Sequence, residues 1–434
     1  MKKILVIVCL LFPALTFGQK PVPVNPQKES IVLLGGTAHI GNGNVIENSV
    51  IGFENGKINI VANAENSADE IKKYSKVIDI TGKHVYPGFI AMNTILGLLE
   101  IGAVRATADF AEVGDLNPNV RSIIAYNTDS KITPTIRTNG ILLAQITPSS
   151  GLISGSSSVV ELDGWNWEDA AFKIDEGIHL NWSRMFTYLN RRSSNPTFKK
   201  NEEYDKFINR ITKFFENAKA YSEIKTHAEK NLKFEAVKGL FEEKTSLFIH
   251  ADFAKEIIEA VDIAKSAGIK KIVIVGGREA WRITDFLIEN NIAVVVEEPH
   301  SLPGRGEDDV DLPYKLPYLL SKEGITVAID GSGEPMQLRN IPFYAGTAVA
   351  YGMKKEESLK MLTSNAAKIL GIDDKVGTLE TGKFATLFVS KGDALDMLTN
   401  DVEIAFIEGK NVDLRNEQKE LYYRYMKKYG LKIK

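Results

Sequence analysis

The stretch Val85–Glu100, VYPGFIAMNTILGLLE, decides how the rest of the chain is interpreted. It begins with a nearly continuous apolar run, which is typical of a strand buried on both faces. Pro87-Gly88 marks a change of direction within it. We therefore interpret this stretch as the passage from a small β-rich region into a larger α/β body.

Short strand-like runs lie on both sides of this body. Residues 28–86 place apolar runs between glycine-rich turns, and Asn55-Gly56 within them is a two-residue hairpin signal. Residues 376–414 return to the same pattern. We expect one small, discontinuous β-sandwich domain built from these N- and C-terminal segments. A final helix is expected within residues 415–434, where apolar residues recur at helical spacing.

The central part of the chain, residues 87–375, alternates strand-like and helix-like segments. Ser246–Ile249, Lys271–Val275 and Ile292–Val296 are mostly apolar runs, and helical spacing of apolar residues follows between them. This alternation implies right-handed crossovers and a parallel sheet. Several such units in a chain of this length favour a TIM-like (β/α)8 barrel over an open sheet.

Two other segments of the central part carry different patterns. Gly140–Ile146 is a predicted strand, and Ser149–Ser158 after it is rich in serine and glycine, so we predict a loop there. Residues 201–243 are charged but contain one apolar stripe at helical spacing. They predict a helical insertion packed on the outside of the barrel.

The overall composition is that of an ordinary soluble globular protein. Of 434 residues, 44% are apolar and 25% are charged, and the formal net charge is −3. This balance gives no reason to expect nucleic acid or an acidic membrane surface as a partner. The length allows one large barrel with an accessory domain.

The first residues, Met1–Gly18, have the layout of a secretory signal peptide. Lys2 and Lys3 precede an apolar run, Ile4–Phe17, which is shorter than the ~20 residues that a membrane-spanning helix needs. The chain's single cysteine, Cys9, lies inside this run, so the mature protein would have no disulfide and no thiol nucleophile. We expect a periplasmic or secreted protein with no membrane segment after signal cleavage.

Four motifs spread over the mature chain carry a family resemblance. They are Lys83–Ile90 (KHVYPGFI), Thr363–Gly371 (TSNAAKILG), Val376–Lys383 (VGTLETGK) and Phe406–Val412 (FIEGKNV). Together with the β/α alternation, they resemble the amidohydrolase superfamily, and most of all its imidazolonepropionase-like branch. The resemblance implies a hydrolase that acts on carbon–nitrogen bonds other than peptide bonds. It also implies zinc or another divalent metal as the cofactor.

The same resemblance shows that most metal-ligand positions are substituted. Active members carry histidines on the first barrel strand, histidines at the ends of the fifth and sixth strands, and an aspartate at the end of the eighth. Here Asn93 and Ile95 replace the first-strand histidines, and Gly276-Gly277 occupies the end of the sixth strand. His179 and His227 show no spacing typical of ligands. Zinc sites need three or four His, Cys or carboxylate ligands, so the ligand set is largely missing.

Five residues remain candidates for the site. His250 fits the fifth-strand metal ligand. Ser332 takes the position of the eighth-strand aspartate, and Asp330 lies two residues earlier, where it either points away or is brought back by a loop shift. Asp330 and His300 are the candidate catalytic residues, since both follow barrel strands. Asn93 and Ser332 are the candidate ligand-binding residues.

Three hypotheses about function remain open. The chain is a working hydrolase with a degenerate metal site, or a catalytically inactive protein that binds a ligand or pairs with an active amidohydrolase paralogue, or a catalyst of unrelated chemistry at the same barrel mouth. The expected partners are a small-molecule substrate or ligand and a second copy of the chain or such a paralogue. Nucleic acid is not expected. Purified protein is predicted to hold less than one equivalent of zinc.

Overall fold

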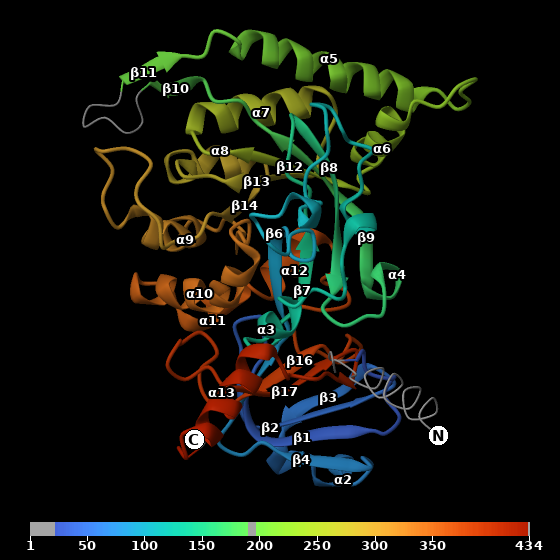
Figure 1. Cartoon of the computed structure of the whole chain (residues 1–434), viewed down its shortest axis with the longest axis vertical. Helices are drawn as coiled ribbons and strands as arrows, with labels where there is room; N and C mark the ends of the chain where they lie inside the picture. Colours follow the sequence, from blue (N-terminus) through green and yellow to red (C-terminus); the bar gives the residue numbers. More distant parts are fainter. Residues whose placement is uncertain (1–21, 190–196, 433–434) are drawn as a thin grey trace, which may run out of the picture.

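The computed structural model describes residues 22–189 and 197–432, so the predicted signal peptide, residues 1–18, lies outside the described residues. The described chain forms two bodies (Figure 1). A barrel with its surrounding helices occupies the upper part of that view, and a sheet domain made from both ends of the chain lies below it.

The larger body is an eight-stranded barrel. Its strands, in order round the barrel, are β6 (Phe89–Thr94), β7 (Ile141–Ile146), β8 (Ile153–Glu161), β9 (Ala171–Asn181), β12 (Ser246–Ala251), β13 (Ile272–Gly276), β14 (Ala293–Val296) and β15 (Val327–Ile329). The first and last strands meet at a parallel bridge between Met92 and Asp330. There the backbone N–H of Gly331 donates to the carbonyl of Met92 at 2.8 Å. The predicted TIM-like barrel is therefore confirmed.

One strand departs from the expected all-parallel arrangement. β8 runs antiparallel to both β7 and β9. The loop predicted over Ser149–Ser158 is wrong from Ile153 onward, because these residues begin a fully buried strand. Small side chains fit a crowded barrel interior, and the hydroxyl groups of Ser157 and Ser158 find hydrogen-bond partners there. Serine content alone therefore misled the prediction.

Helices surround the barrel on its outside (Figure 1). The helices of this body are α3 (Thr133–Arg137), α4 (Trp167–Ala170), α5 (Tyr204–Glu223), α6 (Leu232–Phe241), α7 (Ala254–Ser266), α8 (Thr284–Glu289), α9 (Leu312–Lys322), α10 (Ile341–Ala350), α11 (Lys355–Lys360) and α12 (Ser364–Leu370). The helical insertion predicted near 201–243 corresponds to α5 and α6. Its apolar stripe, including Ile211 and Phe215, is buried. A short hairpin, β10 (Phe186–Leu189) with β11 (Thr197–Lys200), precedes α5.

The smaller body is one hydrogen-bonded sheet built from both ends of the chain. Its strands are β1 (Ile31–His39), β2 (Val45–Glu54), β3 (Lys57–Asn63), β4 (Lys76–Asp79), β5 (His84–Pro87), β16 (Leu387–Ser390), β17 (Val402–Ile407) and β18 (Lys410–Asn411). The hairpin predicted at Asn55-Gly56 joins β2 to β3, and both residues have positive φ, as a tight two-residue turn requires. A short helix, α2 (Ala68–Ile71), lies between β3 and β4. β5 leads directly into β6, so Val85–Glu100 connects the two bodies as expected.

The end of the barrel nearer the sheet domain holds a second cavity, of about 510 Å³. The C-terminal helix α13 (Glu417–Lys428) forms one wall of it. Arg137 and Asp163 form a buried ion pair there, with 3.0 Å between guanidinium and carboxylate. Glu161 is buried beside them, and its nearest cation, the ammonium of Lys410, is 3.5 Å away. In the described part of the chain, no helix is long and apolar enough to cross a membrane.

Candidate functional site

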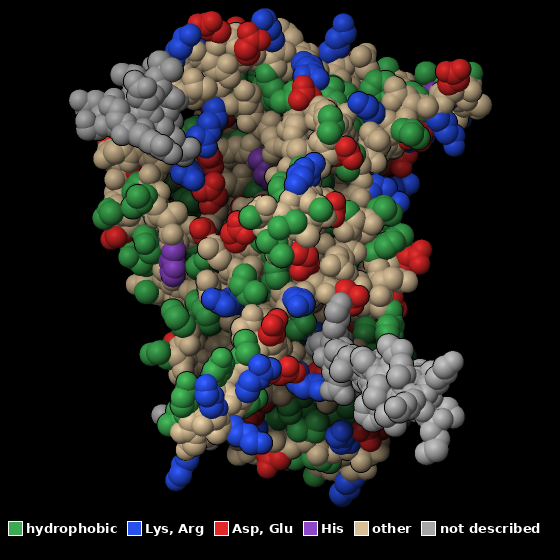
Figure 2. Space-filling model, viewed as in Figure 1, with side chains coloured by type: hydrophobic (Ala, Val, Ile, Leu, Met, Phe, Trp, Pro, Cys, Tyr) green, Lys and Arg blue, Asp and Glu red, His purple; other side chains and the backbone are tan. Residues whose placement is uncertain are grey.

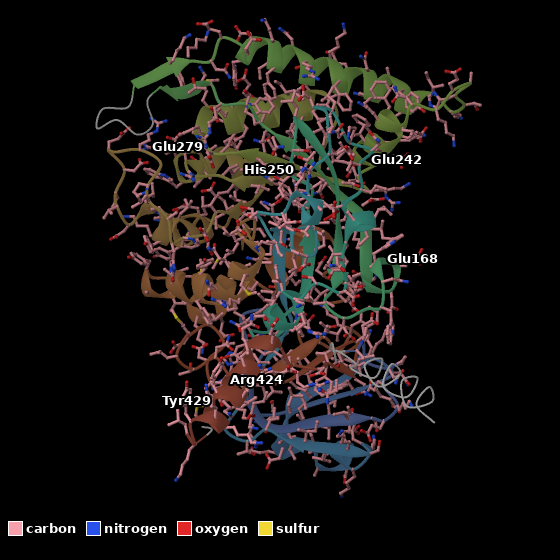
Figure 3. All side chains as sticks on the ribbon, in the orientation of Figure 1. Glu168, Glu242, His250, Glu279, Arg424 and Tyr429 are labelled. Atoms are coloured by element: carbon pink, nitrogen blue, oxygen red, sulfur yellow. The ribbon has the colours of Figure 1, made fainter. Side chains whose placement is uncertain are left out.

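The carboxyl ends of the barrel strands surround a cavity of about 560 Å³. Figure 2 shows the hollow, with a histidine visible inside it, and Figure 3 labels His250 at that place. Side chains at this end of a barrel come from many different strands, which is why catalytic groups gather there. The cavity is lined by Asn93, Ile95, Phe110, Thr147, Pro148, Ser149, Asn181, Trp182, Arg184, His250, Ala251, Asp252, Glu256, Val275, Gly276, Glu297, Asp330 and Ser332.

Asp330 is the carboxyl group at the base of this cavity. It follows β15 and is buried. Its Oδ1 accepts hydrogen bonds from the side-chain amide of Asn93 at 2.8 Å and from the backbone of Ser332 at 2.9 Å. Its Oδ2 accepts from the hydroxyl of Ser332 at 2.8 Å. Burial nevertheless raises the pKa of Asp330 to about 7. A carboxyl group with such a pKa can accept and release a proton near neutrality.

Asn93 holds Asp330 from a strained backbone position. Its φ is 52°, which is the left-handed region, although it lies in strand β6. Asparagine tolerates this region better than most residues, but the conformation still costs free energy. The backbone N–H of Asn93 donates to Oε1 of Gln145 at 2.9 Å, and its amide donates to Asp330. These two hydrogen bonds keep the side chain directed at the carboxyl group.

The backbone strain at Asn93 gives a testable difference between two substitutions. Asn93→Ala and Asn93→Gly both remove the amide that holds Asp330, but only alanine keeps a Cβ at positive φ. We expect Asn93→Ala to be less stable than Asn93→Gly by about 1 kcal/mol, measured by urea unfolding. If the alanine variant proved equal or more stable, the backbone of residue 93 would not hold a positive φ in solution.

His250 lies on β12 and lines the cavity, and its ring is hydrogen-bonded to the ring of His179. Nε2 of His250 and Nδ1 of His179 are 2.9 Å apart. Burial lowers the pKa of His250 to about 4, and it lowers that of His179 well below the usual value, with His250 as a second cause. Both rings are therefore neutral at pH 7. The ring of His179 also stacks on Phe248, with 4.8 Å between ring centroids, which fixes its plane.

Behind His179 the barrel interior contains more polar groups. Nε2 of His179 lies 2.9 Å from the hydroxyl of Ser157, which in turn lies 2.8 Å from Oε1 of Glu176. Nε2 of Gln145 donates to the same Glu176 oxygen at 2.8 Å. All four side chains are buried. Burial raises the pKa of Glu176 to about 7, and its hydrogen bonds to Ser157 and Gln145 oppose that shift.

Charged side chains form the outer wall of the cavity. Arg184 donates to Asp252 at 3.0 Å, and Arg278 donates to Glu297 at 2.6 Å. Burial and the nearby Asp252 raise the pKa of Glu297, and burial raises that of Glu256. Figure 2 shows acidic and basic side chains together beside the hollow. The wall is therefore acidic overall but largely paired.

Comparisons with known proteins agree with the barrel fold. A model of the amidohydrolase family matches residues 320–412. The crystal structure of an amidohydrolase from Thermotoga maritima MSB8 is 27% identical and covers 89% of this chain and 100% of its own, with a TM-score of 0.78. The chain is thus similar to the amidohydrolase family over residues 320–412, and to this amidohydrolase structure over most of its length. The comparison with curated proteins found no match.

Two more distant structures share the fold of this chain. A Xaa-Pro dipeptidase with bound methionine in its active site is 14% identical, covers 88% of this chain and 100% of its own, and has a TM-score of 0.54. The ochratoxinase of A. niger is also 14% identical, with 89% and 96% covered and a TM-score of 0.54. At this identity, the likeness concerns the fold alone.

Most of the site residues predicted from the sequence lie together in the structure. Asn93, His250, Asp330 and Ser332 all line the one cavity, and Asp330 faces the site, which answers the question of its direction. His300 is not among the lining residues. It lies after β14, where Nε2 is 2.8 Å from the hydroxyl of Thr347. The structure therefore separates this candidate catalytic residue from the other four.

The positions that the resemblance assigns to metal ligands also reach this cavity. Ile95 and Gly276 stand on its wall, and neither side chain can coordinate a metal. Across residues 22–189 and 197–432, no group of three or more His, Cys, Asp or Glu side chains is arranged to hold a metal ion.

Sequence reasoning missed the groups behind the cavity. His179 was dismissed for lack of ligand spacing, and Ser157 was placed in a loop. The run Ala171–Asn181 contained the missed signal, because an acidic residue and a histidine three positions apart, Glu176 and His179, stand in a strand-length segment between two others. Polar residues within the buried part of a barrel strand, such as these two in β9, point to a hydrogen-bonded network.

Proposed function

We propose that this chain is an exported amidohydrolase-type hydrolase that acts on a non-peptide carbon–nitrogen bond, with a degenerate metal site. The imidazolonepropionase-like branch is the best fit, because the four sequence motifs quoted above belong to its pattern. The observation that carries the proposal is Asp330, a buried carboxyl group in the barrel-mouth cavity with its pKa raised to about 7. General bases are most effective when their pKa lies near the working pH.

The chemistry assigned to Asp330 is a proton transfer. Water adds its oxygen to the carbonyl carbon of the substrate, and Asp330 accepts the proton that the water loses. The carbon–nitrogen bond then breaks, and the leaving nitrogen takes that proton from Asp330. Asn93 and Ser332 hold the carboxyl group in one orientation throughout, since they donate to both of its oxygens. Arg184, on the cavity wall, is a cation that can face the developing oxyanion.

The side chains at the cavity suit a tightly bound zinc ion poorly. Ile95 and Gly276 offer no ligand atom, and His250 offers only Nδ1, because its Nε2 is hydrogen-bonded to His179. Both oxygens of Asp330 accept hydrogen bonds from neighbouring donors. Zinc sites draw on three or four His, Cys or carboxylate ligands. We therefore assign no step to a metal ion.

Metal analysis tests this assignment directly. Protein purified without chelators and dialysed against metal-free buffer is expected to hold less than one equivalent of zinc by elemental analysis. The reason is that His250 and Asp330, two ligands alone, cannot provide the binding free energy of a complete site. One or two tightly bound metal ions would contradict the assignment, and would mean that other side chains move to complete a site.

A substrate panel tests the function itself. The panel contains N-acyl amino acids, cyclic amides and ureas, with dipeptides included because dipeptidases share the fold. Release of amine or ring opening, saturable with substrate concentration, is the expected result. Calorimetry with the same compounds provides the second readout. Saturable binding without turnover of any compound would favour the alternative, a catalytically inactive protein that binds a ligand or serves as the partner of an active paralogue.

Localisation is part of the proposal and has its own support. The layout of Met1–Gly18 is that of a signal peptide. Fractionation of cells that express the full chain should find the processed protein outside the cytoplasm, and an intact N-terminus in the cytoplasm would contradict it.

A further inference from the structure

The polar groups in the barrel interior form one continuous chain that ends at the cavity. We call Gln145, Glu176, Ser157 and His179 the interior chain. We infer that the interior chain determines which ring nitrogen of His250 carries the proton, so that Nδ1 of His250 remains a hydrogen-bond acceptor for substrate or water. The inference rests on the proposed function for its catalytic meaning, but the test below does not need turnover.

The direction of the interior chain is set at its far end by a backbone group. The N–H of Asn93 can only donate, and it donates to Oε1 of Gln145 at 2.9 Å. The amide of Gln145 must therefore turn its Nε2 toward Glu176, where the separation is 2.8 Å. Oε1 of Glu176 consequently acts as an acceptor.

Ser157 determines which partner donates in the next hydrogen bond, because its hydroxyl has a single proton to give. Its hydroxyl lies 2.8 Å and 3.0 Å from the two oxygens of Glu176, closer than the 3.4 Å to the carbonyl of Gly177. An ionised Glu176 therefore receives that proton, so the oxygen of Ser157 can only accept, as it does from Nε2 of Gln145 at 3.2 Å. Nε2 of His179, at 2.9 Å, must then be the donor.

The two histidines complete this series of hydrogen bonds. At pH 8.5, well above the ordinary histidine pKa of about 6.5, His179 is neutral, so a proton on Nε2 leaves Nδ1 bare. Nδ1 of His179 then accepts from Nε2 of His250 at 2.9 Å. His250 is neutral at this pH as well, so with a proton on Nε2 its Nδ1 has a lone pair. The hydrogen bond made by one ring nitrogen thus fixes the state of the other.

A lone pair on His250 suits the chemistry proposed for the cavity. It can accept from the attacking water or from a substrate N–H, while Asp330 handles the proton transfer. Glu176 and Ser157 do not line the cavity. They are positioning residues, which act only through His250. This is the logic by which a buried acid orients a histidine base, with a serine and a second histidine placed in between.

The test is the state of His250 measured by ¹⁵N NMR. Protein labelled with ¹⁵N-histidine is recorded at pH 8.5, where Glu176 is ionised, and His250 is assigned by its loss in His250→Gln. The expected spectrum has an unprotonated Nδ1 and a protonated Nε2. Glu176→Gln, whose amide donates to Ser157, should shift His250 toward the opposite state. Ser157→Ala should leave a mixture, and Glu161→Gln, a matched buried acid at the other end of the barrel, should leave His250 unchanged.

Two results would overturn the inference. The first is a proton on Nδ1 of His250 in the unmodified protein, which needs no variant to fold. The second is an unaltered His250 in both Glu176→Gln and Ser157→Ala. The expected NMR result in a protein that turns over no substrate would instead count against the proposed function alone.

Discussion

Asp330→Asn should lower the turnover of any substrate found by at least about 100-fold, because general-base catalysis contributes factors of that size. Asparagine has nearly the same shape and can still accept from Asn93, so the cavity should keep its form. The substrate KM should change little, since the loss concerns proton transfer rather than binding. The measurement is steady-state kinetics for wild type and variant under the same conditions.

The matched control for this variant is Glu161→Gln, which also neutralises a buried acid with a raised pKa but lies at the opposite end of the barrel. Turnover by this control should equal that of the wild type. The pH profile adds a second check, since the wild-type rate should rise as the pH passes the value of about 7 for Asp330. Wild-type activity in Asp330→Asn would remove Asp330 from the mechanism.

Glu161→Gln should stabilise the protein at pH 8 by several kcal/mol, yet leave its stability at pH 4.5 almost unchanged. Burial raises the pKa of Glu161 to about 8, with Glu408 adding to the shift and Lys410 opposing it. The folded state therefore keeps a proton that the unfolded state has already lost above about pH 4.5. The wild type loses stability as the pH rises from about 4.5 to 8, because the unfolded state gains free energy by releasing this proton while the folded state must keep it. Glutamine has no such cost.

Urea unfolding of wild type and Glu161→Gln at several pH values measures this difference. The gap between the two free energies of unfolding should widen steadily up to about pH 8 and then stay constant. Lys410→Met is the complementary variant. This variant lacks the cation 3.5 Å from Glu161, so it should lose more stability at high pH than the wild type does. A gap that did not depend on pH would mean that Glu161 is ionised normally.

Much of the architecture could be predicted from local patterns. The alternation around β12, β13 and β14 identified the barrel, and Asn55-Gly56 identified a hairpin, because each depends on residues close in sequence. β8 could not be predicted in this way. Its serine residues are buried only because Glu176 and other groups in the interior satisfy their hydroxyls. That satisfaction depends on contacts between distant strands, which no local pattern contains.

The candidate site was predictable in location but not in arrangement. Three residues singled out through the family motifs, Asn93, His250 and Asp330, line one cavity in the structure. The direction of Asp330 depends on the positive φ of Asn93 and on the Ser332 hydrogen bonds, which sequence does not reveal. His179 was out of reach for a related reason. Its role comes from the pairing of β9 with β12, and those strands are separated by the whole helical insertion.

The bridge between Met92 and Asp330 joins the last strand of the barrel to the first. Asp330 is thus both the proposed base and part of the contact between β6 and β15 that closes the barrel, which we call the seam. Any fluctuation that parts β15 from β6 moves this carboxyl group away from Asn93, so opening of the barrel and loss of catalytic geometry are one event. Exchange of the amide hydrogen of Gly331, which bonds to Met92 across the seam, should report how often that event occurs. A ligand that contacts both β6 and β15 would hold the two strands together and slow that exchange.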